Sequence, residues 1–482
     1  MQKQKSITVN FIMNMLLTMS SIIFPIITFP YVSRILLPVG TGRVSFATSV
    51  VAYFAMFAQL GIPTYGISAC AKIRDDKEKL TQTVQELFII NMIMSIIAYL
   101  VLGIAIFRIE RLYRDRVLIL IISLTIIFNA IGFEWLYKAL EQYTYITIRS
   151  VIFKFIALIA MFLLVHEQTD YIYYGAITIL ASSASNILNF LNIHKYISLA
   201  PRKKYNLKRH MKAVMVFFAM SCATTIYTNL DTVMLGFLKT EQEVGYYNAA
   251  VKIKSILVSL VTSLGTVLLP RASYYVEKGL KDEFYRITKK ALNFVILIAT
   301  PIFIYFTIYA REGIYFLSGT AYAGSVIPMQ IIMPTLLFIG MTNIMGIQML
   351  IPLGKEKYVL YSEIWGAITD LILNWILIPR LGAAGAAIGT VVAEIVVWCV
   401  QFHYLKEDVI IIYKQIHYAR IIFAILAGSV ASLWIKQMAC TSFVKLVLSS
   451  IVYFGIYFGI LLVKRETLVI EILRKVQKIV CR

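Results

Sequence analysis

Polar side chains inside long apolar segments are the residues of this sequence whose types and spacing could do chemistry. The clearest pattern lies within residues 213–237, where hydroxyl and carboxyl groups recur every three or four residues and so share one face of a helix. This face predicts a hydrophilic cavity wall ending in a carboxylate, because ionisable groups inside a membrane span generally face water or a partner. Alternatively, the hydroxyls bond to their own helix and pack against neighbours. The face comprises Ser221, Thr224, Thr225, Thr228, Asp231 and Thr232.

A second polar face runs along residues 10–32. Prolines follow it, and a proline removes a backbone donor and kinks a helix. The segment therefore either lines a cavity and bends during transport or contains a static kink, and both interpretations stay open. The residues are Asn10, Asn14, Thr18 and Ser21, followed by Pro25 and Pro30.

Cations inside or beside the apolar segments predict an anionic ligand. Arginine binds phosphate bidentately and lysine acts as a point charge. We predict a substrate-binding role for Arg34, Arg43, Lys154 and Lys252. Lys252 and Lys254 are two residues apart and cannot share a face, so at most one of them points inward. The alternative is that these side chains extend to the membrane interface, and it is stronger for Arg43 than for Lys154.

Other chemical patterns are scarce. The acidic residues within apolar segments could pair with cations or bind H⁺ or Na⁺, and Asp231 is the candidate for ion coupling. We find no glycine-rich phosphate loop, zinc spacing or nucleophile triad, and the cysteines are scattered. We therefore predict no catalytic residue, metal or cofactor, and no enzyme. The acidic residues are Glu134, Asp231, Glu363, Asp370 and Glu394.

The elements that must position these groups are membrane helices. The 482 residues are 60% hydrophobic and 15% charged, whereas about a quarter of a soluble protein is charged. The apolar runs do not alternate, which excludes a membrane β-barrel, so the predicted fold class is all-α and integral to the membrane. A window of roughly 20 apolar residues gives about fourteen transmembrane helices. Their approximate ranges are 10–32, 44–68, 84–107, 117–137, 147–165, 172–193, 213–237, 244–270, 291–310, 327–352, 357–378, 384–404, 419–435 and 446–463.

The net charge of +21 would suggest nucleic acid in a soluble protein. Here it predicts topology instead. Placing the N-terminus inside puts about 32 Lys and Arg in cytoplasmic loops and about 10 outside, as expected for a membrane protein. Both termini are then cytoplasmic, and no nucleic-acid partner is expected. One external loop departs from the rule, because it carries Arg108, Arg111, Arg114 and Arg116.

The chain reads as two halves joined by a basic linker at 194–212. We predict an N-terminal six-helix bundle at 1–200, a second bundle at 201–410, and two further helices with a basic tail at 411–482. A weak repeat supports the division, with a short glycine-containing turn before a small-residue helix at 33–47, 231–250 and 381–389. Transporters are often built from repeated bundles with the substrate site between them.

Several segments resemble a known family. They read FPYVSRIL at 29–36, GTGRVSFA at 40–47, QLGIPTYG at 59–66, FEWLYK at 133–138, NLDTVMLG at 229–236, and NWILIP running into GAAIGT at 374–390. Their order and spacing resemble the bacterial oligosaccharide flippases called Wzx, within the multidrug/oligosaccharidyl-lipid/polysaccharide exporter superfamily. The resemblance spans nearly the whole chain, and Arg34 and Asp231 match positions that are commonly charged in that family.

This resemblance implies two six-helix bundles in a V shape plus two extra helices, working by alternating access. The implied function is to move undecaprenyl-diphosphate-linked oligosaccharide units from the inner to the outer leaflet of the bacterial cytoplasmic membrane. The product would be a surface polysaccharide, such as lipopolysaccharide O-antigen or capsule. The implied partners are the lipid-linked anionic oligosaccharide, membrane lipids and the polysaccharide polymerase machinery. Two alternatives stay open: a multidrug or cation antiporter of the same superfamily, disfavoured by the intramembrane cations, and a membrane polysaccharide polymerase, disfavoured by the small external loops.

Overall fold

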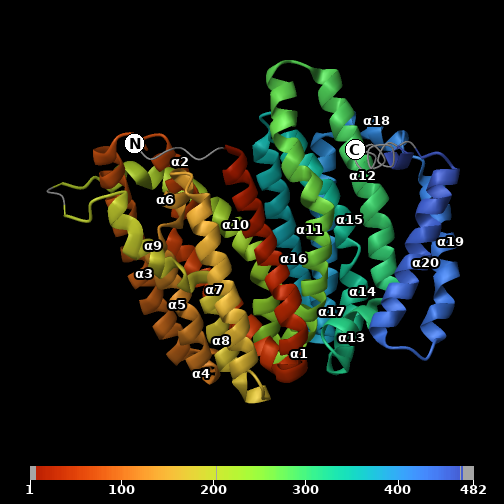
Figure 1. Ribbon diagram of the computed structural model, residues 1–482, viewed down its shortest axis with the longest axis horizontal. Coiled ribbons are helices and arrows are strands. Elements are labelled where there is room, and N and C mark those ends of the chain that lie inside the picture. The colour runs from red at the N-terminus through yellow and green to blue at the C-terminus, as the bar shows by residue number, and fades with distance from the viewer. Residues whose placement is uncertain (1–6, 202–203, 467, 471–482) are drawn as a thin grey trace. The chain divides into compact units, whose positions relative to one another are not determined.

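The fold is all-α, as predicted. A computed structural model describes residues 7–201, 204–466 and 468–470, and no residue within these ranges lies in a strand. The chain forms two compact units that divide at Gly245, an N-terminal unit and a C-terminal unit (Figure 1). The exposed large side chains on the helices are mostly apolar, which is the surface that hydrocarbon requires of a membrane protein.

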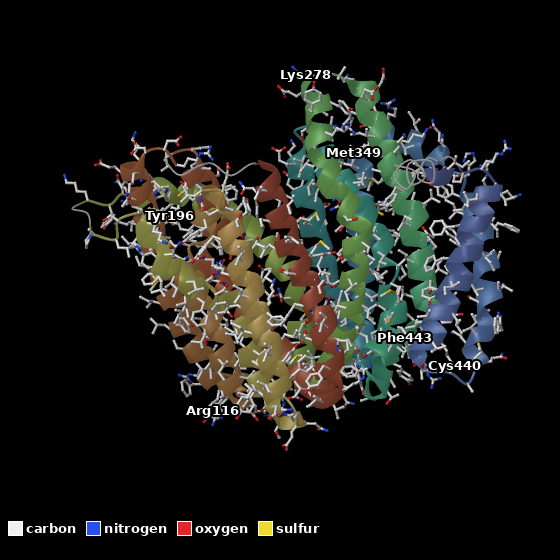
Figure 2. The ribbon with its side chains drawn as sticks, in the orientation of Figure 1. Arg116, Tyr196, Lys278, Met349, Cys440 and Phe443 are labelled. Carbon is white, nitrogen blue, oxygen red and sulfur yellow. The ribbon has the colours of Figure 1, made fainter. Side chains whose placement is uncertain are left out.

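The helices of the N-terminal unit alternate between its two ends (Figure 1). Figure 2 shows Tyr196, in the basic linker, and Arg116, in the arginine-rich loop, at opposite ends of these helices, as the predicted topology requires. The bounds are α1 Ile7–Gln59, α2 Ile62–Ala71, α3 Lys77–Arg108, α4 Glu110–Arg114, α5 Arg116–Gly132, α6 Glu134–Ala139, α7 Tyr143–Leu164, α8 Tyr171–Ile179, α9 Asn186–Asn192 and α10 Lys208–Leu238.

The C-terminal unit contains the remaining helices, and α11 spans the division between the units. The bounds are α11 Glu241–Glu277, α12 Lys281–Ile308, α13 Ala310–Leu317, α14 Val326–Ile332, α15 Thr335–Thr342, α16 Glu356–Leu381, α17 Ala383–Tyr404, α18 Lys406–Lys414, α19 Tyr418–Leu433 and α20 Ser442–Val463. Shorter 3₁₀ and π segments join them: η1 Gln168–Asp170, η2 Leu180–Ala184, η3 Ile193–Lys195, η4 Thr320–Ser325, η5 Asn343–Leu350 and η6 Trp434–Gln437.

In the part of the chain that the structure describes, ten helices are long and apolar enough to cross a membrane, or eleven if one bent pair forms a single span. Each of the fourteen predicted ranges overlaps a helix, but the count of fourteen is not confirmed. Two reasons are visible: α1 continues through two predicted ranges, and α5 has only 17 residues.

The helix α1 contains 53 residues and is interrupted at Leu37, whose φ of 55° and ψ of −179° are not helical. A straight helix of that length would extend about 80 Å at 1.5 Å per residue, far beyond the ≈ 30 Å hydrocarbon core of a bilayer. Leu37 precedes Pro38, and the proline ring disfavours the helical conformation of the residue before it. The break therefore separates the two predicted ranges 10–32 and 44–68.

The first part of α1 runs parallel to α7. Three hydrogen bonds join them at different depths, and in each the two residues are 134 positions apart, so the helices keep one register. The bonds run from Thr147 Oγ1 to Met13 O (2.8 Å), from Lys154 Nζ to Ser20 Oγ (2.8 Å) and from Tyr31 Oη to Val165 O (2.9 Å). We call this pair of helices the α1–α7 seam.

Two copies of the repeated turn pack against each other within the N-terminal unit. A Cβ added to Gly42 would lie 1.8 Å from Glu241 O, and one added to Gly245 would lie 2.0 Å from Pro38 O. Gly42 corresponds to Gly245 in the repeat, and Pro38 corresponds to Glu241. The contacts are therefore reciprocal, as at a two-fold interface, and both positions require glycine.

The compact units follow this packing rather than the basic linker. The helix α10 packs on α1 and α2 and belongs to the N-terminal unit, so the units divide at Gly245 and not near residue 200. The predicted bundles 1–200 and 201–410 and the segment 411–482 stay predictions about functional halves.

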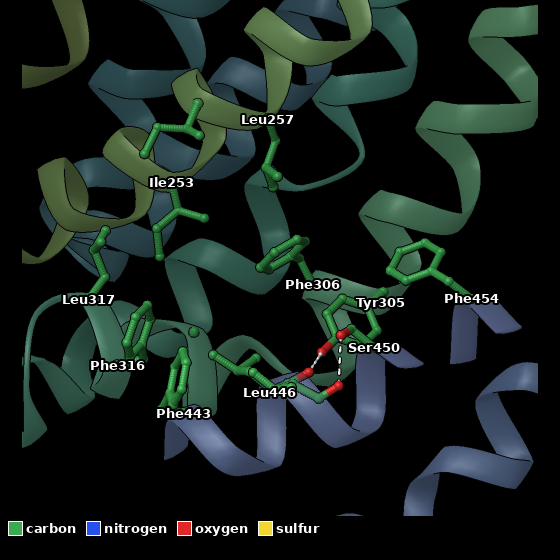
Figure 3. Close-up of a pocket in the computed structure, with 13 residues that line it drawn as sticks. Ile253, Leu257, Tyr305, Phe306, Phe316, Leu317, Phe443, Leu446, Ser450 and Phe454 are labelled. Atoms are coloured by element: carbon green, nitrogen blue, oxygen red, sulfur yellow. Dashed lines mark hydrogen bonds between the residues drawn. The ribbon is translucent and has the colours of Figure 1, made fainter. Parts of the chain in front are cut away.

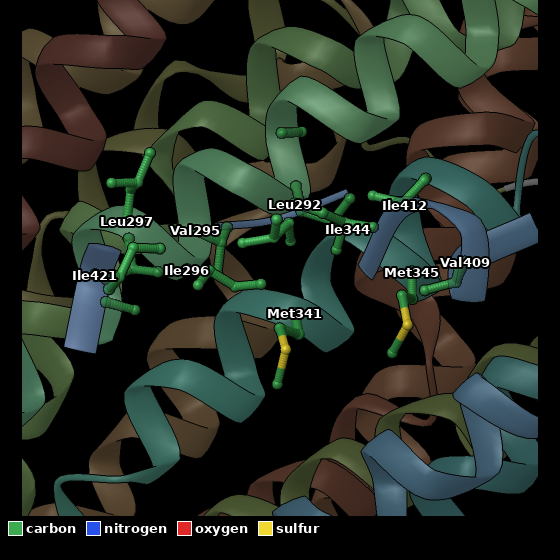
Figure 4. Packing of buried hydrophobic residues seen from close by; sticks show 14 of the residues in the cluster. Leu292, Val295, Ile296, Leu297, Met341, Ile344, Met345, Val409, Ile412 and Ile421 are labelled. Carbon is green, nitrogen blue, oxygen red and sulfur yellow. The ribbon is translucent and has the colours of Figure 1, made fainter. Parts of the chain in front are cut away.

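Each unit has its own apolar core. In the C-terminal unit, side chains of α12, α15, η5, α18 and α19 interdigitate, among them Leu292, Met341, Ile344, Val409 and Ile421 (Figure 4). In the N-terminal unit, one cluster joins α2, α3 and α6 to the starts of α7 and α10, and a second lies along the α1–α7 seam. These cores fix the helices on which the polar residues stand.

We expect Gly42→Ala to destabilise the N-terminal unit, because the new methyl group would overlap Glu241 O. Overpacking of this kind costs about 1–3 kcal/mol or more. Gly103→Ala on α3 is the matched control, since a Cβ there meets nothing within 4 Å and alanine favours a helix over glycine. Thermal unfolding of the detergent-solubilised protein would test this, and equal melting temperatures for the two variants would contradict it.

Candidate functional site

The predicted cation Lys154 lies on the predicted polar face of α1. Its Nζ donates to Ser20 Oγ at 2.8 Å and to Ser21 Oγ at 2.7 Å. The side chain is half-buried, and an ammonium group in apolar surroundings needs such partners. The sequence predicted the two features separately, and the α1–α7 seam brings them together at one depth.

The polar face of α1 is exposed at the same level. Asn14 and Thr18 are both exposed, and Thr18 Oγ1 donates to Asn14 O at 3.0 Å. In the most apolar 18-residue stretch of α1, 11% of the residues are buried, and in that of α10, 6% are buried. The corresponding share in the other eight helices that could span a membrane is 22–50%. The two least buried helices therefore carry the two predicted polar faces, and they pack on each other.

On α10 both interpretations of the hydroxyl pattern apply. Thr228 Oγ1 donates to Thr224 O at 2.8 Å, so these hydroxyls do bond to their own helix, yet both residues are exposed. Ser221 and Thr225 are half-buried. Asp231 is buried, with 7% of its surface exposed, so its carboxylate ends the face inside the protein.

Beside the α1–α7 seam lies an arginine that the sequence analysis missed. Arg149 on α7 is 4% exposed, and its Nη1 donates to Ser185 Oγ at 2.7 Å and Asn186 Oδ1 at 2.9 Å. Its Nη2 lies 3.4 Å from Glu134 Oε2, and Glu134 Oε1 lies 2.8 Å from Lys138 Nζ. Arg149 was missed because it stands near the start of a predicted span, where arginines commonly extend to the interface. The four-residue spacing of Glu134 and Lys138, which predicts a helical ion pair, was a usable signal.

At the opposite end of the N-terminal unit, Arg43 belongs to an ion-pair network. Its Nη1 donates to Tyr171 Oη at 3.0 Å, and its Nε lies 3.8 Å from Asp115 Oδ1. Arg111 Nη1 lies 3.0 Å from Asp115 Oδ2 and 3.2 Å from Glu241 Oε1. The Asp115 carboxylate, whose side chain is 1% exposed, thus joins α1 to α4, and Arg111 extends the network to the start of α11.

Three of the four arginines that depart from the predicted charge rule have partners in the structure. Arg111 pairs with the buried Asp115 and the partly exposed Glu241. Arg114 forms a surface pair with Glu110 at 2.7 Å, and this hydrogen bond raises the pKa of the arginine. Arg116 lies over the ring of Tyr113. These contacts hold the loop in place, and the substrate-binding role predicted for Arg43 stays a prediction.

A third polar cluster anchors the basic linker. Glu86 on α3 is fully buried, and its carboxylate accepts from Asn206 N at 2.8 Å and lies 2.7 Å from Arg209 Nη2 and 2.9 Å from His210 Nε2. Tyr65 Oη lies 2.8 Å from His210 Nδ1 on the other side of the ring. The end of the linker is thus fixed to the N-terminal helices where α10 begins.

The structure places the other two predicted cations on α1 and α11. Arg34 is exposed and donates to Pro30 O on its own helix. Lys252 is exposed on α11 in the C-terminal unit. Among the described residues, no group of three or more His, Cys, Asp or Glu side chains could hold a metal ion.

The C-terminal unit contains an apolar pocket of about 330 Å³ between α11, α12, α13 and α20 (Figure 3). Leu257, Phe306, Phe316 and Phe443 are among its lining residues. The nearby Tyr305 hydroxyl is occupied, since it donates to Leu446 O at 2.8 Å. A lining of this kind offers contacts to hydrocarbon and almost none to a sugar or phosphate.

Proteins of similar sequence include membrane transporters. The chain is 23% identical over 396 residues to a protein named putative O-antigen transporter of Escherichia coli (strain K12), covering 82% of this chain and 95% of the relative. A second putative O-antigen transporter, of Shigella dysenteriae, is 24% identical and covers 78% of this chain and 94% of the relative. A protein named probable low-salt glycan biosynthesis flippase Agl15, of Haloferax volcanii, is 24% identical over about half of each chain.

Two solved structures share the fold. The lipid II flippase MurJ in an inward closed conformation superposes with a TM-score of 0.64 and 17% identity, over 91% of this chain and 98% of MurJ. A multidrug resistance MATE family transporter in an inward-facing conformation gives a TM-score of 0.56 and 15% identity, over 82% of this chain and 96% of the transporter. The predicted all-α membrane fold is confirmed by these similarities.

We expect Asp115→Asn to destabilise the protein strongly, because it leaves Arg111 and Arg43 without their shared counter-charge. Breaking a buried ion pair by removing one partner typically costs about 3–5 kcal/mol. Glu110→Gln, in the exposed pair with Arg114, should change the melting temperature little, because surface pairs contribute little. Equal thermal stability of Asp115→Asn and the unaltered protein would show that the network is not required.

Two family profiles match the chain. The profile of a family named MatE matches residues 217–376. The profile of a family described as polysaccharide biosynthesis protein matches residues 7–276, more than half of the chain, and includes the α1–α7 seam and α10. With the helical fold and the O-antigen transporter relatives, these matches place the protein among multi-pass membrane transporters. The chain belongs to the polysaccharide biosynthesis protein family.

Proposed function

We propose that the protein moves an undecaprenyl-diphosphate-linked oligosaccharide from the inner to the outer leaflet of the bacterial cytoplasmic membrane, with both termini in the cytoplasm. The observation that carries this proposal is the α1–α7 seam, where Lys154 contacts the polar face of α1. Only 11% of the residues in the most apolar 18-residue stretch of that helix are buried. A lysine at such a place suits an anionic headgroup. The transporter and flippase names of the relatives support the same substrate class.

The polar face would lower the energetic cost of this movement. Burying a charged, hydroxyl-rich headgroup in hydrocarbon is prohibitive unless the protein supplies partners. Asn14, Thr18 and Ser21 offer hydroxyl and amide groups along α1, and Thr224 and Thr228 do so along α10. The diphosphate and sugars would follow these groups, while the polyprenyl chain stays in lipid.

Transport by alternating access would follow from this arrangement. The two functional halves would expose the polar faces first to the cytoplasmic side and then to the external side. An inside-negative membrane potential favours outward movement of an anion by ~2.3 kcal/mol per charge per 100 mV. Completed units would pass to the polysaccharide polymerase machinery.

A multidrug exporter is the second candidate, because the MatE profile matches residues 217–376 and a MATE transporter shares the fold. Such a protein would carry organic cations. The cationic groups of Lys154 and Arg149 beside the polar face oppose that substrate electrostatically. Accumulation of a lipid-linked sugar intermediate in a deletion strain, without altered drug resistance, would separate the two candidates.

We expect Lys154→Ala to reduce export of surface polysaccharide several-fold without lowering protein abundance, because the headgroup loses its cationic partner on α1. Lys281→Ala is the control, since Lys281 is exposed at the start of α12 and lies outside the seam. Quantifying surface polysaccharide and membrane protein in the same cells would test this. Normal export by Lys154→Ala would remove this lysine as a headgroup ligand.

We further propose that Asp231 couples transport to H⁺ or Na⁺, because it is a buried acid at the end of the polar face of α10. Collapsing both ion gradients should then slow repeated flipping in vesicles that contain the purified protein. Asp231→Asn should flip at a rate that does not respond to the gradients. Flipping by the unaltered protein that is unchanged without either gradient would exclude ion coupling.

A further inference from the structure

The inner end of the N-terminal unit contains a carboxylate that the polar face does not use. Glu134 begins α6, and its two oxygens lie 2.8 Å from Lys138 Nζ and 3.4 Å from Arg149 Nη2. Its side chain is 38% exposed, whereas that of Arg149 is 4% exposed. The carboxylate is therefore the accessible member of the group and the guanidinium is the buried one.

Arg149 is positioned without help from Glu134. Ser185 and Asn186 accept two hydrogen bonds from Nη1, and Asn186 Nδ2 in turn donates to Asn129 Oδ1 at 3.2 Å. These acceptors directly follow the π-helical segment η2, a type of distortion that often occurs at functional sites. Gly132 allows the close approach, since a Cβ there would lie 2.6 Å from Asn186 Cγ. Removing the carboxylate would thus leave the guanidinium in place.

The guanidinium retains binding capacity. The separation of 3.4 Å between Arg149 and Glu134 exceeds the ≈ 2.7–2.9 Å of a strong charge-assisted hydrogen bond. Arg149 Nε is buried and has no hydrogen-bond partner among the described residues. An arginine can donate to two oxygens of one phosphate at once. Glu134 offers a single oxygen at 3.4 Å, so part of the donor capacity of Arg149 stays unused.

The depth of the group matches a headgroup at the inner leaflet. Arg149 lies about 9 Å along α7 from its first residue, and Lys154 follows about 7.5 Å further on, at 1.5 Å per residue. In the predicted topology α7 begins on the cytoplasmic side. An anion bound by Lys138 and Arg149 would therefore be one short step from Lys154 and the polar face of α1.

We propose that Glu134 occupies the binding position of a substrate diphosphate in the empty protein. The incoming pyrophosphate ester displaces the Glu134 carboxylate from Lys138 and Arg149 and takes over both cations, which makes this the loading site for the lipid-linked substrate. The exchange replaces one anion by another, so neither cation is ever buried without a counter-charge. The inference rests on the proposed function and specifies where the substrate first binds.

The test is a titration of the purified full-length protein in detergent with inorganic pyrophosphate and with undecaprenyl diphosphate. Glu134→Gln should bind both probes about tenfold more tightly than the unaltered protein, because the carboxylate no longer competes for the two cations, and a tenfold change corresponds to about 1.4 kcal/mol. Lys138→Gln should bind both about tenfold more weakly. Lys138 is partly exposed, so this variant tests the cation side without unfolding the core around Arg149.

Glu110→Gln is the matched control, because Glu110 and Arg114 form an ion pair of the same helical spacing at the opposite end of the unit. It should leave both affinities unchanged. Unaltered or weaker binding by Glu134→Gln would overturn the inference, and so would binding of inorganic pyrophosphate without binding of the lipid diphosphate. Flipping in vesicles is measured separately. A protein that flips the lipid-linked sugar but shows no effect of Glu134→Gln refutes only the loading site, and a protein that does not flip it refutes the proposed function.

Discussion

The structure depends on one constraint: a charge inside a membrane span needs a partner or water, because hydrocarbon provides neither. The N-terminal unit meets this constraint in different ways at different depths. At one end, Asp115 neutralises Arg43 and Arg111 within a buried network. At the other end, Glu86 does the same for Arg209. Between them, Lys154 donates hydrogen bonds to two serine hydroxyls, and no carboxylate among the described residues forms an ion pair with it.

This difference separates structural charges from functional ones. Ion pairs at short distance, such as Arg111 with Asp115 at 3.0 Å and Arg209 with Glu86 at 2.7 Å, hold helices together. A lysine that donates to neutral hydroxyls, as Lys154 does, keeps its positive charge available to an anion. An arginine that shares a carboxylate with a lysine, as Arg149 does, can exchange that carboxylate for another anion. The unit therefore has rigid ionic ends and a cationic middle, which is the distribution that a moving anion requires.

The sequence alone predicted the helices and the two polar faces, but it did not predict the contacts between residues that are far apart in the chain. Apolar length specified the helices, and the three- to four-residue spacing identified the polar faces of α1 and α10. The contact between Lys154 and Ser21 joins residues far apart in the chain, so no local pattern could reveal it. Arg43 was predicted as a cavity cation, and its contacts with Asp115 and Tyr171 could not be foreseen because these partners come from other parts of the chain. The division at Gly245 depends on the packing of α10 against α1, whereas the sequence shows only the basic linker.

The reciprocal glycine contact ties the two copies of the repeated turn to each other. Gly42 lies against the turn that contains Gly245, and Gly245 lies against the turn that contains Gly42. A side chain added at either glycine would collide with the backbone of the other copy. A substitution in one copy of the turn is therefore felt in the other copy as well.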